Sequence, residues 1–547
     1  MRAGRGLSAI ELLLWCAGAT ALVQVMLWYF GDVAGFSPIF RVLLKAYDGD
    51  GNFLLLFIAL GAFLLRGRPE IMPVVQFTAD RPWSVAALLF PVLCLGSVWA
   101  YHDFPLSMDE YSTTFQARVF AAGKLSGDFP LELLDRLILR PFQGLFFIVS
   151  RSTGEVSTAY WPGFSLLLAP FYWAHVPWAA NPLIGALTIP AIHRLALQVT
   201  GSREAGGWAI LLTVASPVFI VTSISYYSMP AHLLCDMTYA LLLLKPTVRR
   251  ALLAGVVGSV ALTLHIPVRH LLFSMPFFAW LVFRPGSRGI LAALCLGYLP
   301  LSLVLGVGWQ YYLHELVRVG GPLPALETLP RALTLLSRLT LESRIAGLTK
   351  VWTWGVLGLL VLAACGFMLA WRRTAVRLLV ASLALTFLAY FFFAGDQGHG
   401  WGNRALYSAW FVVPLLASIA LSEAGGGQGE ALRRMAGWGI ALSLVLSNAL
   451  RLTQADAFIA QHLRQIPPLA QPLQPGYRDI VFVRFEGRLY AHDLIQNDPF
   501  LRAPRVVMLL GSRQSAEALM TRFPDYRKKA EGDWGQWWVA APGAAER

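Results

Sequence analysis

Charged residues and cysteines are both scarce in this sequence. Only 14% of its 547 residues are charged, whereas 56% are hydrophobic. Because a soluble globular chain has about 25% charged residues, the composition excludes that class. The five cysteines all fall inside apolar stretches, with neither the spacing of a metal site nor a disulfide framework. We therefore predict an all-α polytopic membrane protein whose cysteines are packing residues.

Acidic residues are fewer than basic ones, 31 against 44, which gives a formal net charge of +13. The basic residues concentrate in short linkers between apolar runs, which is the positive-inside pattern of membrane proteins. This pattern explains the surplus without nucleic acid as a partner, and no soluble basic-aromatic module argues otherwise. It places the amino terminus in the cytoplasm, with the first helix retained in preference to a cleaved signal peptide.

Apolar runs near the length of a bilayer span predict about thirteen transmembrane helices. The longer runs are 8–30, 84–101, 181–198, 205–223, 250–267, 288–308, 350–371, 376–394, 405–422 and 434–452. Three shorter ones lie near 52–66, 231–245 and 270–284. If the run 161–173 also crossed the membrane, it would break the alternation of basic linkers, so we expect a re-entrant or interfacial segment there.

The sequence divides into three parts. These are N-terminal transmembrane helices at 1–83, a transmembrane core at 84–452 with outer loops 102–180 and 309–349, and an extracytoplasmic domain at 453–547. The last part is less apolar and shows candidate strands at 479–485, 505–511 and 534–540 with a helix at 513–522. We predict that it is a small α/β domain.

Two adjacent carboxylates, Asp109 and Glu110, stand where the run 84–101 leaves the membrane. A charge near the hydrocarbon edge is costly unless it is hydrated or paired, so such groups are candidates for function. The structural alternative is that both residues cap and charge the first turn of the following helix. No metal or cofactor is required by the pattern, although two acids beside a phosphate could recruit a divalent metal ion.

Other polar side chains lie in turns that the topology places on the same outer face. They are His232, His265, Arg269, His270, His399, Trp401, Arg404 and Tyr407. Cations suit an anionic lipid head group, and the planar fork of arginine matches phosphate. Each residue alone could instead anchor the interface or serve a tight turn. Their convergence on one face favours a site that binds a ligand with an anionic head group, such as a phosphate.

Three segments resemble a known family in their order and spacing. MDEYSTTFQARVFAAGKL is similar to an acidic first-loop motif, YWPGFSLLLAPFYW to a proline-glycine segment, and GHGWGNRALYSAWFVVPLL to a late arginine-tyrosine-proline segment. They are typical of polytopic glycosyltransferases with the C-type fold, the group of protein O-mannosyltransferases and the lipid A aminoarabinose transferase. The resemblance covers roughly residues 84–422. In this chain Trp161-Pro162 replaces the usual Tyr-Pro-Pro, and residues 229–232 contain no second acid.

This resemblance implies an integral protein of a bacterial inner membrane that moves a sugar from a polyprenyl-phosphate donor to an acceptor hydroxyl, with inversion, on the extracytoplasmic face. Asp109 would take the acceptor proton, with Glu110 orienting it or holding the sugar. His265, Arg269, His270 and Arg404 would stabilise the phosphate charge. The partners implied are the donor, membrane lipids and an acceptor that is a protein, a lipid or a glycan.

Two other functions use similar residues. A lipid or solute transporter, or a flippase, would bind its cargo with intramembrane charges, but transporters often show matching halves and midplane charges. Here the halves do not match and the charges lie at one face. A polysaccharide polymerase or ligase would also use a lipid-linked sugar and a large outer loop, so it stays open beside the transferase.

Overall fold

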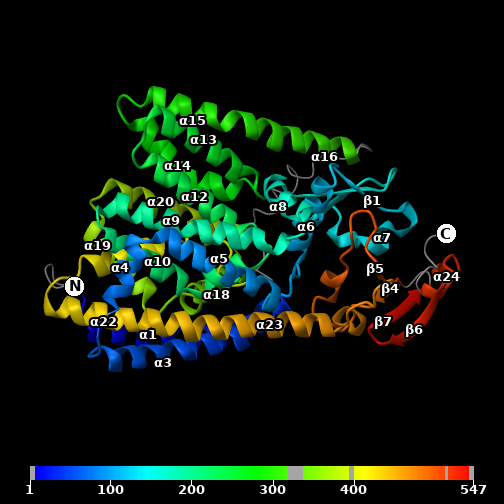
Figure 1. The fold of residues 1–547 in the computed structure, drawn as a ribbon, viewed down its shortest axis with the longest axis horizontal. Coiled ribbons are helices and arrows are strands. Elements are labelled where there is room, and N and C mark those ends of the chain that lie inside the picture. The colour runs from blue at the N-terminus through cyan, green and yellow to red at the C-terminus, as the bar shows by residue number, and fades with distance from the viewer. Residues whose placement is uncertain (1–6, 70, 318–336, 393–399, 512–514, 541–547) are drawn as a thin grey trace.

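The computed structural model describes residues 7–69, 71–317, 337–392, 400–511 and 515–540. His399 and residues 318–336 of the predicted outer loop lie outside these ranges. Helices form a long body, and both small sheets lie at one end of it, opposite the end marked N (Figure 1). The turn between α14 and α15 also lies at the end opposite the sheets (Figure 1).

The first 100 residues form two long helices and a shorter pair. In order these are α1 (Ala9–Phe30), α2 (Pro38–Val42) continuing through a π-helical segment (Leu43–Asp48) into α3 (Gly49–Leu65), α4 (Met72–Asp80) and α5 (Pro82–Trp99). α1 packs against α3, and α3 packs against α22 (Gly426–Leu442), so the start of the chain lies beside its last long helix (Figure 1).

The remaining helices form the body and its outer cap. Those up to residue 301 are α6 (Met108–Ala121), α7 (Leu134–Leu137), α8 (Gly163–Trp173), α9 (Ala180–Thr200), α10 (Arg203–Val214), α11 (Pro217–Ser223), α12 (Met229–Leu243), α13 (Val248–Thr263), α14 (Val268–Phe283) and α15 (Arg288–Leu301). Those beyond it are α16 (Trp309–Val317), α18 (Arg338–Thr353), α19 (Leu359–Ala370), α20 (Thr374–Tyr390), α21 (Val412–Ser422) and α23 (Asn448–Arg464).

Six helices of the described residues are long and apolar enough to cross a membrane, or seven if the bent pair α10–α11 is one span. The six are Ala9–Phe30, Pro38–Leu65, Pro82–Trp99, Pro177–Thr200, Arg288–Val317 and Gly426–Arg464. Shorter apolar helices lie among them, and the predicted number of thirteen spans stays a prediction. Large apolar side chains face outward, including Phe57 (67% exposed) and Trp99 (71% exposed), as a lipid-facing surface requires.

Some predicted runs have different boundaries in the structure. The run 205–223 is broken before Pro217, where α10 and α11 meet at 66°. The run 350–371 is likewise two helices, because α18 ends at Thr353 and Gly358 turns the chain with a φ of +69° before α19. α8 has 11 residues, about 16 Å of helix, which is too short to cross a bilayer and agrees with an interfacial segment.

The end of the body that carries the sheets combines the loop after α5 with the C-terminal region. In the loop, β1 (Gly127–Asp128), β3 (Glu155–Thr158) and β2 (Phe147–Val149) form an antiparallel sheet in that order. In the C-terminal region the order is β5 (Arg505–Leu509), β4 (Arg478–Val483), β7 (Gly535–Ala540) and β6 (Tyr526–Gly532), with only β5 parallel to its neighbour, and α24 (Ala516–Met520) precedes β6.

The loop after α5 and the C-terminal region share one hydrophobic core. Phe115 of α6, Phe147 of β2 and Phe482 of β4 are fully buried in the same cluster. Tyr111 adds polar links, because its hydroxyl donates to the Asn497 carbonyl (3.0 Å) and accepts the Asn497 N–H (2.7 Å). The C-terminal sheet therefore holds α6 in place.

Candidate active site

Asp109 lies in the first turn of α6. The Arg404 guanidinium forms an ion pair with its Oδ2, and the Tyr160 hydroxyl donates to its Oδ1. The side chains of Asp109 and Arg404 are 22% and 13% exposed, so this pair is reachable by a ligand. Burial alone would raise the pKa of Asp109, but the charge of Arg404 lowers it below the usual range. Asp109 is therefore an ionised carboxylate.

Glu110 points the other way, into the protein. Its carboxyl group is fully buried and accepts four hydrogen bonds, from the Tyr101 hydroxyl (3.0 Å) and the N–H groups of Tyr226 (2.8 Å), Leu106 (2.9 Å) and Ser107 (3.3 Å). Burial raises its pKa to about 8. Glu110 thus joins the start of α6 to the turn before α12, which is the capping role that the sequence allowed for either acid.

His265 lies beside this pair, in the turn between α13 and α14. Its ring stacks on Tyr160 with centroids 3.7 Å apart and planes 30° apart, and its carbonyl accepts the Trp161 N–H (3.1 Å). Among the described residues, its Nδ1 has no hydrogen-bond partner. Burial and then the charge of Arg269 lower the pKa of His265 to about 3, so the imidazole is neutral.

Positive charge exceeds negative charge around Asp109. Arg404 lies over the ring of Tyr227, 4.4 Å from its centroid, and the charge of Arg269 acts on both Asp109 and His265. One carboxylate therefore faces two guanidinium groups, which leaves one positive charge for an anion. A guanidinium group can donate two parallel hydrogen bonds to two oxygens of one phosphate, so the excess positive charge fits a phosphate.

The turn that carries Arg404 depends on glycine. Gly400 has a φ of +116°, and a Cβ there would lie 2.3 Å from the Cδ of Arg404. Gly402 has a φ of +65°, and a Cβ there would lie 2.4 Å from Val218. Trp401 between them is buried, and its Nε1–H donates to the Tyr101 hydroxyl (3.3 Å). The two glycines thus allow the positive φ angles of this turn, and Gly400 leaves room for the Arg404 side chain.

Other predicted site residues lie deeper in the protein. His270 is fully buried, with its Nδ1 2.6 Å from Asp236 and its Nε2 2.7 Å from the Tyr298 hydroxyl. Tyr407 is 1% exposed and stacks on Trp410. His232 is fully buried, and neither ring nitrogen has a hydrogen-bond partner in the described part of the chain. The structure thus gathers Asp109, Arg404, His265 and Arg269, with Trp401 beneath.

Three residues at or near the site carry more weight than the sequence assigned to them. Tyr160 is the first residue of the proline-glycine segment, but no function could be assigned to it from the sequence. Tyr227 could be interpreted as part of an aromatic belt at the membrane surface. Asp236 was missed, although an acid inside an apolar helix is itself a signal. In the described residues, no group of three His, Cys, Asp or Glu side chains could hold a metal ion. Both Asp109 oxygens are engaged by Arg404 and Tyr160.

Comparison with solved structures agrees with the C-type fold that the sequence predicted. The chain is similar to the crystal structure of ArnT from Cupriavidus metallidurans bound to undecaprenyl phosphate, with a TM-score of 0.53 and 14% identity over 84% of this chain and 99% of that one. The apo crystal structure of the same ArnT gives a TM-score of 0.51 and 14% identity over 84% and 98%. No protein-family model and no curated protein matches the sequence.

Proposed function

We propose that the chain is a membrane glycosyltransferase that moves a sugar from a polyprenyl-phosphate donor to an acceptor hydroxyl outside the cytoplasm. The observation that carries the proposal is the carboxylate of Asp109, shared between Tyr160 and Arg404 in a site with excess positive charge. An acceptor hydroxyl needs a base and a leaving phosphate needs cations, and this site has both. The likeness to an ArnT structure bound to undecaprenyl phosphate supports the donor class.

In the proposed reaction, the acceptor oxygen attacks the anomeric carbon from the face opposite the phosphate. The new C–O bond forms as the bond to the phosphate oxygen breaks, which inverts the anomeric centre. The electron pair of the broken bond goes to the phosphate, where Arg404 and Arg269 stabilise it. The acceptor proton goes to Asp109. Glu110 orients the base by fixing the start of α6.

Donor binding would also activate the base. In the free protein Arg404 holds the pKa of Asp109 low, which makes it a weak proton acceptor. A bound phosphate competes for the same guanidinium, so the carboxylate becomes more basic once the donor is in place. Asp109 would then take the proton only in the loaded site.

His270, Tyr407 and Trp401 were predicted to bind donor phosphate or substrate, but all three side chains are buried. In the proposal they act indirectly, by supporting the site from the protein interior. His232 and His399 remain predicted donor-binding residues. The proposed boundaries are 1–83, 84–452 and 453–547. The end of the body that carries the sheets faces outward from a bacterial inner membrane, with the basic linkers in the cytoplasm.

Mass spectrometry of cells tests this proposal. Polyprenyl-phosphate sugars and surface glycans would be compared in cells with the intact chain, a deletion, Asp109→Asn, and Asp128→Asn as a matched exposed control. We expect the deletion and Asp109→Asn to accumulate one lipid-linked sugar and lose one glycan modification. If Asp109→Asn fully rescues the deletion, Asp109 is not the base and transport becomes the better account.

A further inference from the structure

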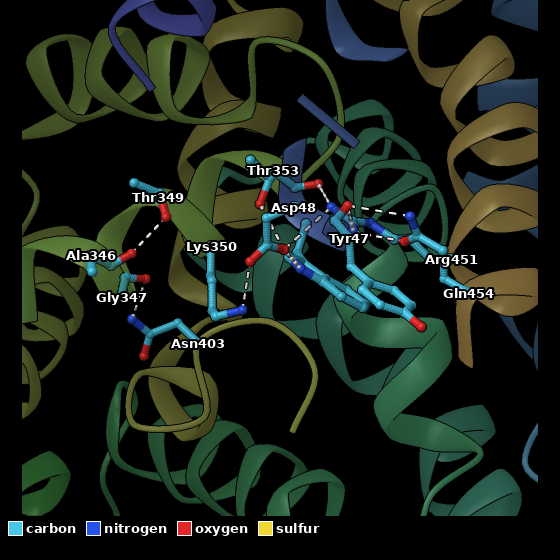
Figure 2. A network of polar contacts seen from close by, with 11 residues as sticks. Tyr47, Asp48, Ala346, Gly347, Thr349, Lys350, Thr353, Asn403, Arg451 and Gln454 are labelled. Atoms are coloured by element: carbon cyan, nitrogen blue, oxygen red, sulfur yellow. Dashed lines mark hydrogen bonds and ion pairs between the residues drawn. The ribbon is translucent and has the colours of Figure 1, made fainter. Parts of the chain in front are cut away.

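A second charged cluster lies inside the helical body, centred on Asp48 at the start of α3 (Figure 2). Its carboxylate is fully buried and contacts Lys350 Nζ (2.5 Å) and Trp354 Nε1 (2.5 Å). It also lies near Thr353 Oγ1 (3.4 Å) and the Arg451 guanidinium (3.6 Å). Buried charges within membrane helices are costly, so a cluster this complete is a candidate for function.

One set of contacts leads from Asp48 to the acidic pair. Trp354, which the carboxylate binds, lies against Trp401 with ring centroids 5.9 Å apart. Trp401 Nε1–H donates to the Tyr101 hydroxyl (3.3 Å), and that hydroxyl donates to Glu110 (3.0 Å). Glu110 in turn fixes the first turn of α6, where Asp109 is the preceding residue.

A second set leads from Asp48 to Arg404. Lys350 belongs to α18, and one turn earlier in that helix the Gly347 carbonyl accepts a hydrogen bond from Asn403 Nδ2 (2.9 Å; Figure 2). Asn403 Oδ1 also accepts the Leu406 N–H (3.3 Å), which closes the turn around Arg404. The position of α18 therefore sets the position of the Arg404 backbone.

The two sets of contacts end beside the two partners of one ion pair, at Glu110 next to Asp109 and at Asn403 next to Arg404. We propose that Asp48 is a positioning residue, which fixes the distance between Asp109 and Arg404 through Trp354–Trp401–Tyr101 on one side and α18–Asn403 on the other. This inference rests on the proposed function. It gives the N-terminal helices, which contribute no side chain to the site described above, a role in the reaction.

The alternative is that the cluster only stabilises helix packing. In that case, removing the Asp48 charge would lower the stability of the whole protein. At temperatures where the protein stays folded, the Arg404 turn would then open no more often than in wild type. Hydrogen–deuterium exchange separates the two, because it reports local opening of the backbone without needing activity. The full chain in lipid nanodiscs would be measured as wild type, Asp48→Asn and Tyr101→Phe. Tyr47→Phe is the control, since among the described residues its hydroxyl has no hydrogen bond in the network.

We expect Asp48→Asn to speed exchange in peptides spanning 400–407 by about tenfold, with 479–483 unchanged, because only the anchored turn opens more often. Tyr101→Phe removes a single hydroxyl and retains the ring, so it tests one set of contacts even if Asp48→Asn fails to fold. It should speed the same peptides to a smaller extent. Tyr47→Phe should match wild type.

Activity gives the second readout. If Asp109 and Arg404 separate, the pKa of Asp109 rises. As the pH is lowered, transfer by both variants should therefore begin to decline at a higher pH than transfer by wild type. The effect on kcat should exceed the effect on the donor KM. Wild-type exchange in 400–407 for both variants would overturn the inference. If wild type itself transfers no sugar, the proposed function fails, whereas the exchange result still decides whether Asp48 positions the turn.

Discussion

Arg404 forms an ion pair with Asp109 although 295 positions separate them in the sequence. The carboxylate comes from the start of α6 and the guanidinium from a glycine-rich turn before α21. Tyr160 binds the other carboxylate oxygen, so the pair has a fixed orientation. This geometry makes separate predictions for the cation, for the tyrosine and for the turn.

Arg404→Gln should change how transfer depends on pH. A carboxylate whose pKa is lowered in the folded protein stays ionised, and its function is lost only as pH falls through that lowered pKa. Without Arg404, burial raises the pKa above about 4, the value of a free Asp. We expect kcat/KM of the variant to decline between about pH 6 and pH 4, where wild type shows no decline due to Asp109.

The control for this prediction is Arg527→Gln on the exposed strand β6. Its profile should follow wild type over the whole range. If Arg404→Gln lowers the rate by the same factor at every pH, Arg404 does not set the pKa of Asp109, and its role is limited to phosphate binding.

Tyr160→Phe should lower kcat and leave the protein folded. The substitution retains the ring that stacks on His265 and removes only the hydroxyl that binds Asp109. A hydrogen bond to a charged group contributes about 1.5–3 kcal/mol, so we expect a loss of roughly 10- to 100-fold. Steady-state transfer with a synthetic donor measures it, and an unchanged kcat would show that Tyr160 does not orient the base.

Gly400→Ala should mimic the loss of Arg404. The added Cβ would lie 2.3 Å from the Arg404 side chain, and the φ of +116° is strained for alanine. We expect the donor KM to rise about tenfold or more as Arg404 is displaced. Gly425→Ala is the matched control, since nothing lies within 4 Å of its Cβ position. Equal effects of both substitutions would contradict the proposed role of the turn.

Much of the fold could be predicted from hydropathy, because a helix in lipid needs a long apolar run. α1, α5, α9 and α20 follow their predicted runs within a few residues. Bends were not readable in the same way, since a run of apolar residues continues through the break before Pro217. β6 was missed because it is a charged edge strand without alternation, as exposed edges often are.

The site was predictable as a set of residue types but not as a set of contacts. Ionisable groups at one membrane face are rare, so the sequence alone could identify candidate site residues. These are Asp109, Arg404, His265 and Arg269. Their pairing depends on tertiary packing across distant segments. His270 shows the limit, because its ring is held by Asp236, which comes from an apolar run in a different helix.

The most direct test of the account is a transfer assay with purified Asp109→Asn and a lipid-linked sugar identified from the cellular experiment. Asparagine retains the shape of the side chain and cannot take the acceptor proton. We predict that sugar transfer falls by about 10²- to 10⁴-fold while donor binding and folding persist. Transfer at a rate close to wild type would contradict the central claim that Asp109 is the base.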